Sequence, residues 1–371
     1  MGHGAGNPLR MTIAASGTEM SASTRSRRAV AFAVPGDPST LTGGSIYDAR
    51  LIAALRSAGR KVTHVVLPDG FPDPAPSALA RSVAALSAVP ATDPLIVDGL
   101  AFGAIPTEAL ARIASPLVAL VHHPLALETG LAPARATVMA ACEAANLGLA
   151  AHVLVPSPHT AQVLQRDYGV PPDRITVALP GVDRPVGAQA PEIPPLVLSV
   201  GLLARRKGHD VLIRALARIA DLDWRAVIVG RNHEPGMVEE LAALVDESGL
   251  ACRVTLAGEV SAARLAALYR HATLFALASR YEGYGMAFAE AMIHGLPVVA
   301  CRTGAVADTV PATAGLLVPP DDAAAFSGAL RRVLADDDLR RSLAKGAKAE
   351  GARLPDWSGT AGRVGGVLDR L

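Results

Sequence analysis

The sequence is poor in cysteine, in aromatic residues and in net charge, and each shortage argues against a class of protein. Its three cysteines, Cys142, Cys252 and Cys301, are scattered without metal-ligand spacing. This argues against a disulfide framework or a zinc site and favours a reducing cytoplasm. The net charge of +1 argues against a nucleic-acid binder that depends on many phosphate contacts. No apolar run approaches the roughly 20 residues that span a bilayer, so we expect no integral membrane segment.

Apolar residues are abundant instead, and they set the size of the interior. The chain has 371 residues, of which 50% are hydrophobic and only 4% aromatic. This length and composition predict two globular domains with Ala/Val/Leu-rich cores. Residues 1–28 contain Gly, Ser, Thr and Arg without a continuous apolar stretch, so we expect a disordered leader rather than a signal peptide.

From Ala29 onward, short apolar runs alternate with amphipathic helical stretches, which is typical of βαβ units in a parallel sheet. In the first half we expect helices that include 46–57 and 134–146, and strands over 29–34, 62–67, 95–97, 117–121, 152–155 and 175–178. In the second half we expect helices over 209–220, 237–246, 286–294, 322–334 and 337–350, and strands over 196–201, 225–230, 253–258, 274–277, 296–301 and 314–320.

The stretch from Pro180 to Pro195 contains five prolines and interrupts this alternation. We therefore expect an α/β protein with two doubly wound, Rossmann-like domains, over residues 29–182 and 196–355, joined by a linker over 183–195. In such folds ligands bind beyond the carboxyl ends of the strands, and two facing domains form a cleft.

The most informative segment is EGYGMAFAE, in which Glu282 and Glu290 flank a glycine-rich turn. Gly283 and Gly285 lack a Cβ and let a ligand approach the main chain. The helix expected from Met286 begins with free N–H groups, which are suited to phosphate. A nucleotide-sugar has a pyrophosphate between two hydroxyl-rich rings, and a carboxylate can accept two hydrogen bonds from a vicinal diol. The alternatives are two unrelated surface acids, or a glycosidase acid–nucleophile pair. The helix start between the carboxylates disfavours that pair, because it pushes them apart.

This segment resembles the E-x7-E signature of the GT-B retaining glycosyltransferases of family 4, also called glycosyl transferases group 1. The resemblance implies that Glu282 binds hydroxyls of the transferred sugar and Glu290 the ribose diol. It implies main-chain contacts to the sugar and diphosphate from Gly283, Tyr284, Gly285, Met286 and Ala287. It also implies an acceptor-binding first domain, a nucleotide-sugar-binding second domain, and a last segment, 356–371, that crosses back to the first domain as a helix.

A second segment, VGLLARRKG from Val200 to Gly208, resembles the family's V-G-x-L-x-x-R-K-G sequence. By that resemblance, Arg206 and Lys207 would stabilise the negative charge of the departing diphosphate. Many relatives carry a further arginine where this chain has Leu202. Either Arg205 or Arg206 compensates for this difference, or the difference weakens catalysis. The alternative interpretation of the whole segment is a solvated basic turn without a catalytic role.

Weaker family-like positions lie elsewhere. Gly43 and Gly44 resemble the first glycine loop near the diphosphate or acceptor, although a plain turn is an equal alternative. His122, favoured over His123, resembles the histidine that touches the transferred sugar; the alternative is a strand cap. Three loop turns complete the set. They carry Val260, whose main chain would read the nucleobase; Arg231 or Asn232, either of which would reach the donor; and Asp308, where relatives usually carry Glu.

The resemblance implies transfer of a sugar from a UDP- or GDP-sugar to an unidentified hydroxyl acceptor, with retention of configuration and without a metal or other cofactor. The acidic groups at Asp221–Asp223 and Asp336–Asp338 are better explained as turn and cap residues than as metal ligands. A front-face route is favoured because no motif side chain is an obvious nucleophile. Two alternatives remain: a catalytically degenerate nucleotide-sugar binder, which Leu202 favours, and a GT-B epimerase. The acceptor, the nucleobase and the oligomeric state stay open.

Overall fold

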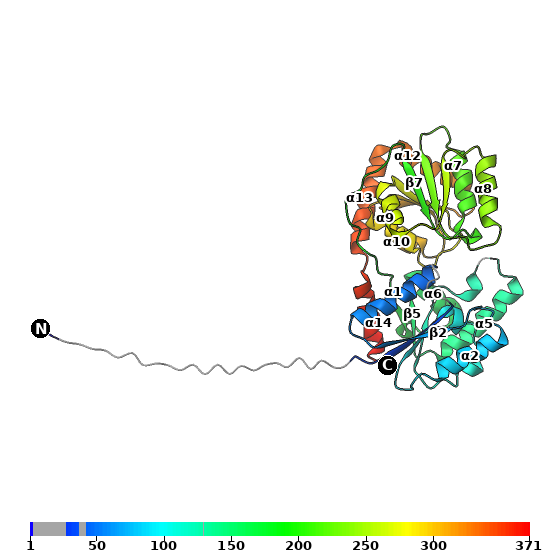
Figure 1. Ribbon diagram of the computed structural model, residues 1–371, viewed down its shortest axis with the longest axis vertical. Coiled ribbons are helices and arrows are strands. Elements are labelled where there is room, and N and C mark those ends of the chain that lie inside the picture. Colours follow the sequence, from blue (N-terminus) through cyan, green and yellow to red (C-terminus); the bar gives the residue numbers. More distant parts are fainter. Residues whose placement is uncertain (3–26, 37–41, 129) are drawn as a thin grey trace.

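The computed structural model describes residues 1–2, 27–36, 42–128 and 130–371. It contains two six-stranded parallel sheets, in the strand orders β2-β1-β3-β4-β5-β6 and β12-β11-β10-β7-β8-β9. Helices flank each sheet, and the two α/β units lie one above the other (Figure 1). The prediction of two doubly wound parallel sheets is therefore confirmed. Most of the expected leader, residues 3–26, lies outside the described residues.

The first sheet and its helices are formed by β1 (Val30–Pro35), α1 (Gly43–Ser57), β2 (Val62–Leu67), α2 (Pro76–Ser87), β3 (Leu95–Asp98), α3 (Gly99–Phe102), α4 (Thr107–Leu110), β4 (Leu117–Leu120), η1 (Leu125–Leu127), α5 (Pro133–Leu149), β5 (His152–Val155), α6 (Pro158–Tyr168), η2 (Pro172–Arg174) and β6 (Ile175–Val177). Successive strand residues point to opposite faces. Ala31 and Ala33 pack toward α2, α3, α5 and α6, whereas Phe32 and Val34 pack toward α1. Both faces are thus covered, which explains why the strands are continuously apolar.

The second unit consists of β7 (Leu196–Val200), η3 (Arg205–Lys207), α7 (His209–Ala217), β8 (Arg225–Val229), α8 (Met237–Glu247), β9 (Val254–Gly258), α9 (Ala262–His271), β10 (Leu274–Leu277), α10 (Met286–Ile293), β11 (Val298–Cys301), α11 (Val306–Thr309), β12 (Gly315–Val318), α12 (Ala323–Ala335) and α13 (Asp337–Arg353). Its sheet is also covered on both faces. Val197 packs toward α7, α8 and α12, while Leu196 and Leu198 pack toward α9 and α10.

The last helix, α14 (Trp357–Leu368), packs against the first sheet although it follows the second unit in sequence (Figure 1). Asp356 caps its start by accepting the Gly359 N–H at 2.7 Å. The Thr360 hydroxyl then donates to the Leu179 carbonyl at 2.8 Å. Residues 178–195 form neither helix nor strand. The chain therefore passes between the two units twice.

Several helices differ from the expectation. Helix α1 begins at Gly43 rather than Ile46, because Thr42 and Ser45 cap each other and hold both glycines in the first turn. Helix α7 ends at Ala217, three residues early, and β11 begins at Val298 rather than Leu296. The helices α2, α6 and α9 were not located individually from the sequence. Each has a local start signal that was available: Pro76 at the start of α2, and the caps Ser157 and Ser261.

Candidate active site

A cavity of about 730 Å³ lies where the carboxyl ends of both sheets meet. Its wall includes residues at the ends of strands from each sheet, such as Val34, Val200 and Leu277. The structure brings together in this wall most of the site residues suggested by the sequence: Gly43, Gly44, His122, Arg206, Lys207, Arg231, Val260, Glu282, Gly283, Tyr284, Gly285, Met286, Ala287 and Glu290. A site between facing sheets was the expectation for two doubly wound units.

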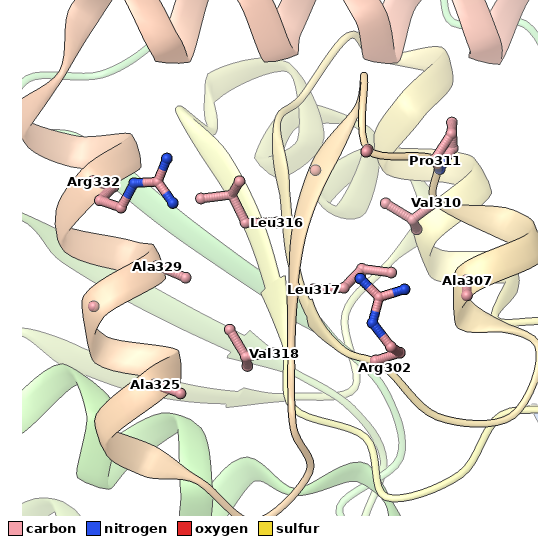
Figure 2. Close-up of a pocket in the computed structure, with 13 residues that line it drawn as sticks. Arg302, Ala307, Val310, Pro311, Leu316, Leu317, Val318, Ala325, Ala329 and Arg332 are labelled. Carbon is pink, nitrogen blue, oxygen red and sulfur yellow. The ribbon is translucent and has the colours of Figure 1, made fainter.

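A second cavity, of about 470 Å³, follows the edge strand β12 beside α12 (Figure 2). Its wall is made mainly of small and aliphatic residues, and Arg302 and Arg332 lie on either side of the strand. None of the sequence-suggested residues lines it, and no carboxylate, histidine or cysteine does. We therefore place the candidate site in the larger cavity.

The glycine-rich turn connects β10 to α10. Gly285 has φ of 85°, a left-handed conformation that favours glycine, and it precedes the first residue of α10, Met286. The N–H groups of Met286 and Ala287 lie in the first turn, where a helix offers no internal acceptor. Both residues line the cavity. The start of α10 can therefore accept an anion such as a diphosphate.

The loop that carries this turn is held by the segment after β11. The N–H of Ala305 donates to the Glu282 carbonyl at 2.8 Å. The hydroxyls of Thr303 and Thr309 donate to the carbonyls of Arg280 and Tyr284, at 2.7 Å and 2.6 Å. This supporting role was missed from the sequence, where the segment was considered for Asp308 alone. Asp308, in the same segment, is exposed and does not line the cavity.

Glu282 is buried and paired with Lys207. The Lys207 Nζ lies 2.7 Å from Glu282 Oε1, and the Ser279 hydroxyl donates to the same oxygen at 2.6 Å. Burial opposes the ionised form of Glu282, but the attraction of Lys207 and Arg206 outweighs it and lowers the pKa of this carboxyl. Burial also lowers the pKa of Lys207, against the attraction of Glu282. The contact between the two groups therefore favours the charged form of each and fixes both in the cavity wall. Its contact with sugar hydroxyls stays a prediction.

Of the two arginines before Lys207, only Arg206 lines the cavity. Its Nη1 donates to the Tyr281 carbonyl at 3.1 Å, and its Nε lies 3.4 Å from Glu128 Oε1 of the first unit. Arg205 instead pairs with Glu240 at 2.8 Å and lies outside the cavity wall. Relatives carry an arginine where this chain has Leu202, and either Arg205 or Arg206 was expected to compensate for it. Only Arg206 lies in the cavity wall, so it is the residue placed to do so.

Arg231 also lines the cavity, and its Nε is buried without a hydrogen-bond partner among the described residues. Buried polar groups in folded proteins nearly always have a partner. A ligand in the cleft is a natural acceptor for this donor. The position of Arg231 thereby fits its expected contact with the donor.

Glu290 lies on α10 and accepts a hydrogen bond of 2.8 Å from the Tyr269 hydroxyl of α9. Burial raises the pKa of Glu290, and the Tyr269 hydrogen bond opposes this rise. The tyrosine thus helps to keep the carboxylate ionised and orients it. An ionised carboxylate is the better acceptor for a ribose diol.

We expect Tyr269→Phe to raise the pKa of Glu290 further. The carboxylate is lost as pH falls through this pKa. Nucleotide affinity should therefore begin to fall at a higher pH in the variant than in the wild type, and we compare the two proteins at one acidic and one alkaline pH. Calorimetric titration with the nucleoside diphosphate at both pH values measures this. Tyr168→Phe, which removes the hydroxyl that bonds Glu143 elsewhere in the chain, is the matched control. Equal affinities of Tyr269→Phe and wild type at low pH would contradict the assignment.

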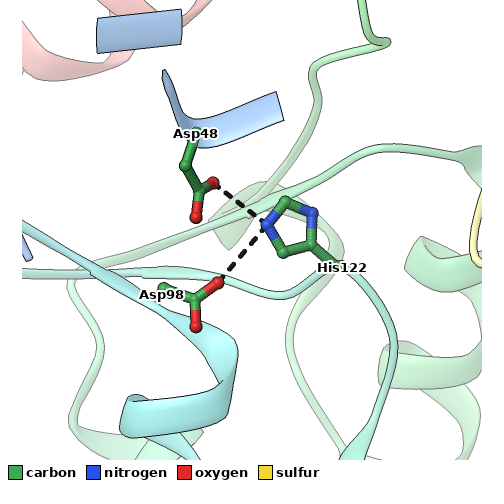
Figure 3. A group of neighbouring side chains, drawn as sticks. All are labelled: Asp48, Asp98 and His122. Atoms are coloured by element: carbon green, nitrogen blue, oxygen red, sulfur yellow. Dashed lines mark hydrogen bonds and ion pairs between the residues drawn. The ribbon is translucent and has the colours of Figure 1, made fainter. Parts of the chain in front are cut away.

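His122 follows β4 and lies between two buried carboxylates (Figure 3). Its Nε2 is 3.0 Å from Asp48 Oδ1 and 3.4 Å from Asp98 Oδ2. The neighbouring Gly44 makes room for the ring, because a Cβ there would lie 3.1 Å from His122 Cδ2. A Cβ at Gly43, by contrast, would meet no atom within 4 Å. Both glycines line the cavity, but only Gly44 is required by the histidine.

The charge of His122 follows from these carboxylates. Burial favours the neutral ring, but attraction to Asp48 and hydrogen bonds to Asp48 and Asp98 outweigh it and raise the pKa of His122 to about 10. Burial raises the pKa of Asp48 to about 7, against the attraction of His122. His122 is therefore an imidazolium at neutral pH. A cation at this position can stabilise negative charge on a ligand.

We expect Asp48→Asn to lower the pKa of His122, because the largest attraction that stabilises its protonated ring is removed while its burial remains. The ring-proton NMR signal of His122 should then titrate at lower pH than in the wild type. Glu128→Gln, which changes the partner of His123 at 2.9 Å, should leave the His122 signal unchanged. A wild-type His122 that titrates near the ordinary value of 6.5 would contradict this account.

Asp48, Asp98 and His122 are also the only group in the described part of the chain whose ligand atoms, all within 4.8 Å of one another, could hold a metal ion. Carboxylate and imidazole ligands suit several divalent cations. A cation would have to displace the proton that the two carboxylates stabilise on the ring, because a metal-bound histidine is neutral. The chemistry of this group therefore fits a proton better than a metal.

Four of the residues that build the site were missed from the sequence: Asp48, Asp98, Glu128 and Tyr269. Asp98 is the last residue of β3, so the rule that ligands bind at strand ends could have identified it. Glu128 and Tyr269 carry no local signal. They reach Arg206 and Glu290 only because segments distant in sequence pack together.

The fold and the cleft define the chain as a member of the GT-B class. Residues 47–184 match the family model described as Glycosyltransferase Family 4, and residues 186–350 match the one described as Glycosyl transferases group 1. The chain belongs to glycosyltransferase family 4, as its motifs indicated. None of the helices in the described ranges combines the length and apolarity that crossing a bilayer requires.

Among curated proteins, the chain is similar to D-inositol 3-phosphate glycosyltransferases. It is 36% identical to the one from Xylanimonas cellulosilytica over 212 residues, which are 52% of this chain and 51% of the relative. The one from Acidothermus cellulolyticus is 36% identical over 223 residues, 54% of this chain and 49% of the relative. The chain thus spans about half the length of the curated relatives it matches.

Among solved structures, sucrose-phosphate synthase from Thermosynechococcus elongatus has a TM-score of 0.80 and 25% identity, covering 93% of this chain and 99% of that protein. Alr3699/HepE from Anabaena, in complex with UDP-glucose, has a TM-score of 0.74 and 20% identity, covering 92% and 99%. These likenesses confirm the predicted GT-B fold.

Proposed function

We propose that the protein transfers a sugar from a nucleoside-diphosphate sugar to a hydroxyl acceptor, with retention of configuration and without a metal. The observation that carries this proposal is the convergence of Arg206, Lys207, Glu290 and the start of α10 in one cavity. Two cations and free helix N–H groups suit a diphosphate, and a buried carboxylate beside them suits a ribose. The family membership and the names of the curated relatives support the same activity.

In the proposed reaction, the bond between the sugar's anomeric carbon and the diphosphate oxygen breaks, and the diphosphate leaves with the bonding electrons. Arg206, Lys207 and the N–H groups of Met286 and Ala287 stabilise its charge. The acceptor oxygen forms the new bond to the anomeric carbon on the same face. Its proton passes to an oxygen of the departing diphosphate, so that no protein nucleophile is needed.

A thermal-shift screen against UDP-, GDP- and ADP-sugars tests donor binding, because a ligand that binds only the folded state raises the melting temperature. UDP-glucose is the first to test, since Alr3699/HepE, which shares the fold, is described in complex with it. At a ligand concentration of 100 Kd we expect about 2.7 kcal/mol of stabilisation. Glu290→Ala should lose most of the shift, whereas Glu247→Ala, an exposed change on α8, should keep it.

Release of the nucleoside diphosphate distinguishes a transferase from a protein that only binds the nucleotide sugar. We expect release in the presence of a chelator at the same rate as without one, because the charge of the diphosphate is met by protein cations. If none of the nucleotide sugars raises the melting temperature, the proposal is removed. A shift without any nucleotide release would favour the binding protein that Leu202 suggested.

A further inference from the structure

We propose that the acceptor for this cleft is an uncharged hydroxyl compound with an apolar face, and not a phosphate ester. The inference rests on the proposed function and names the class of its second substrate. It comes from the division of charge between the two halves of the cavity wall. Among the described lining residues, all lysine and arginine side chains come from the second unit: Arg206, Lys207 and Arg231. The described residues of the first unit, which faces them, contribute no lysine or arginine side chain to the wall.

The first unit instead contributes four carboxylates, from Asp48, Asp69, Asp98 and Glu128. Asp48 and Asp98 face His122, and Glu128 lies 2.9 Å from His123 Nε2 and 3.4 Å from Arg206 Nε. His122, His123 and Arg206 are therefore each paired with at least one of these carboxylates. Asp69 has no ion-pair partner among the described residues.

A phosphate monoester needs cationic donors, of which arginine is the most suited. Near the rim of the first unit, Arg135 is bonded to Asp73 at the surface and does not line the cavity. The start of α1 is also partly used, because the Ser45 N–H donates to the Thr42 hydroxyl at 3.1 Å. Among the described first-unit residues of this wall, a phosphate would meet the unpaired Asp69 and a single cation, His122, whose charge Asp48 and Asp98 already offset, so we expect it to be excluded.

The first-unit wall also carries a set of apolar side chains: Val34, Phe71, Pro72, Leu100, Leu125, Leu131 and Met139. Leu100 has 40% of its surface exposed, although it lies two residues from Asp98 and inside the cavity wall. Exposed apolar surface in a cleft is favourably covered by an apolar part of a ligand. An acceptor that places a hydroxyl near His122 would bring its apolar face against Leu100.

The class of the acceptor is tested by calorimetry on protein that is saturated with the nucleoside diphosphate of the donor. The two probes are octyl β-D-glucopyranoside below its micelle concentration and D-inositol 3-phosphate. We expect the octyl glucoside to bind, and the phosphate ester to bind at least about tenfold more weakly. Leu100→Asp should weaken octyl glucoside binding by about tenfold, because the covered apolar surface is lost. Val138→Asp, which changes an exposed apolar residue of the same unit outside the cavity wall, should not.

The inference is overturned if the phosphate ester binds more tightly than the octyl glucoside. It is also overturned if the octyl glucoside gives no binding heat, or binds Leu100→Asp as well as wild type. Each of these results leaves the proposed function intact when the nucleotide itself binds. Failure of the nucleotide to bind would instead remove the proposed function, and this inference with it.

Discussion

Lys207→Met is expected to lower kcat by about 10²–10³, because one of the cations that stabilise the departing diphosphate is lost. It should also destabilise the fold. The Lys207 ammonium is 2.7 Å from the buried Glu282 carboxylate, and breaking a buried ion pair from one side costs about 3–5 kcal/mol. The single variant therefore mixes a catalytic loss with a structural one.

The double variant Lys207→Met/Glu282→Gln, compared with Glu282→Gln alone, separates these two effects. It removes both charges, and the Ser279 hydroxyl can still donate to the amide oxygen that replaces Glu282 Oε1. We expect its melting temperature to recover most of the loss, whereas kcat stays low. Unfolding curves and nucleotide release measure the two quantities. Recovery of kcat in the double variant would mean that Lys207 acts on the fold alone.

Gly283→Ala is expected to lower the turnover by about 100-fold, since misplacing reacting groups by about 1 Å can have this effect. A Cβ at Gly283 would lie 2.3 Å from the His122 carbonyl oxygen of the first unit. This contact joins the two units at the cavity, beside the hydrogen bond of 3.3 Å from the Thr160 hydroxyl to the Gly283 carbonyl. The added methyl group must therefore move the two units apart.

The fold of each unit should survive this change, because Gly283 does not have the positive φ that alanine disfavours. We expect a melting temperature close to wild type together with a larger radius of gyration in X-ray scattering. Gly148→Ala is the control, since a Cβ on this helical glycine meets no atom within 4 Å. Wild-type turnover by Gly283→Ala would show that close approach of the two units is not needed.

The sequence was sufficient for the strands and for locating the two second-unit motifs that line the cavity. Strands such as Val62–Leu67 and Leu274–Leu277 are apolar and bounded by turns, so their signal is local. Glu282, Glu290, Arg206 and Lys207 lie in two short contiguous motifs whose spacing carries the family pattern. Helix α6 was missed although Ser157 and Pro158 form an ordinary helix start.

The partners of these residues could not be predicted in the same way. Asp48 and Asp98 reach His122 from α1 and β3, and Glu128 reaches Arg206 from the other unit. Such pairs depend on how the sheets and loops pack, which no local pattern records. The charge of the acceptor wall is likewise a property of the assembled cavity, because its residues come from several loops.

The central claim, transfer with retention from a nucleotide sugar, is tested most directly by proton NMR of the anomeric signal during the reaction. The α-linked nucleotide sugar that gives the largest thermal shift is incubated with the protein and octyl β-D-glucopyranoside. We expect free nucleoside diphosphate to appear together with a new α-anomeric signal at the earliest times. A new β-anomeric signal that appears first, together with released nucleotide, would contradict the account.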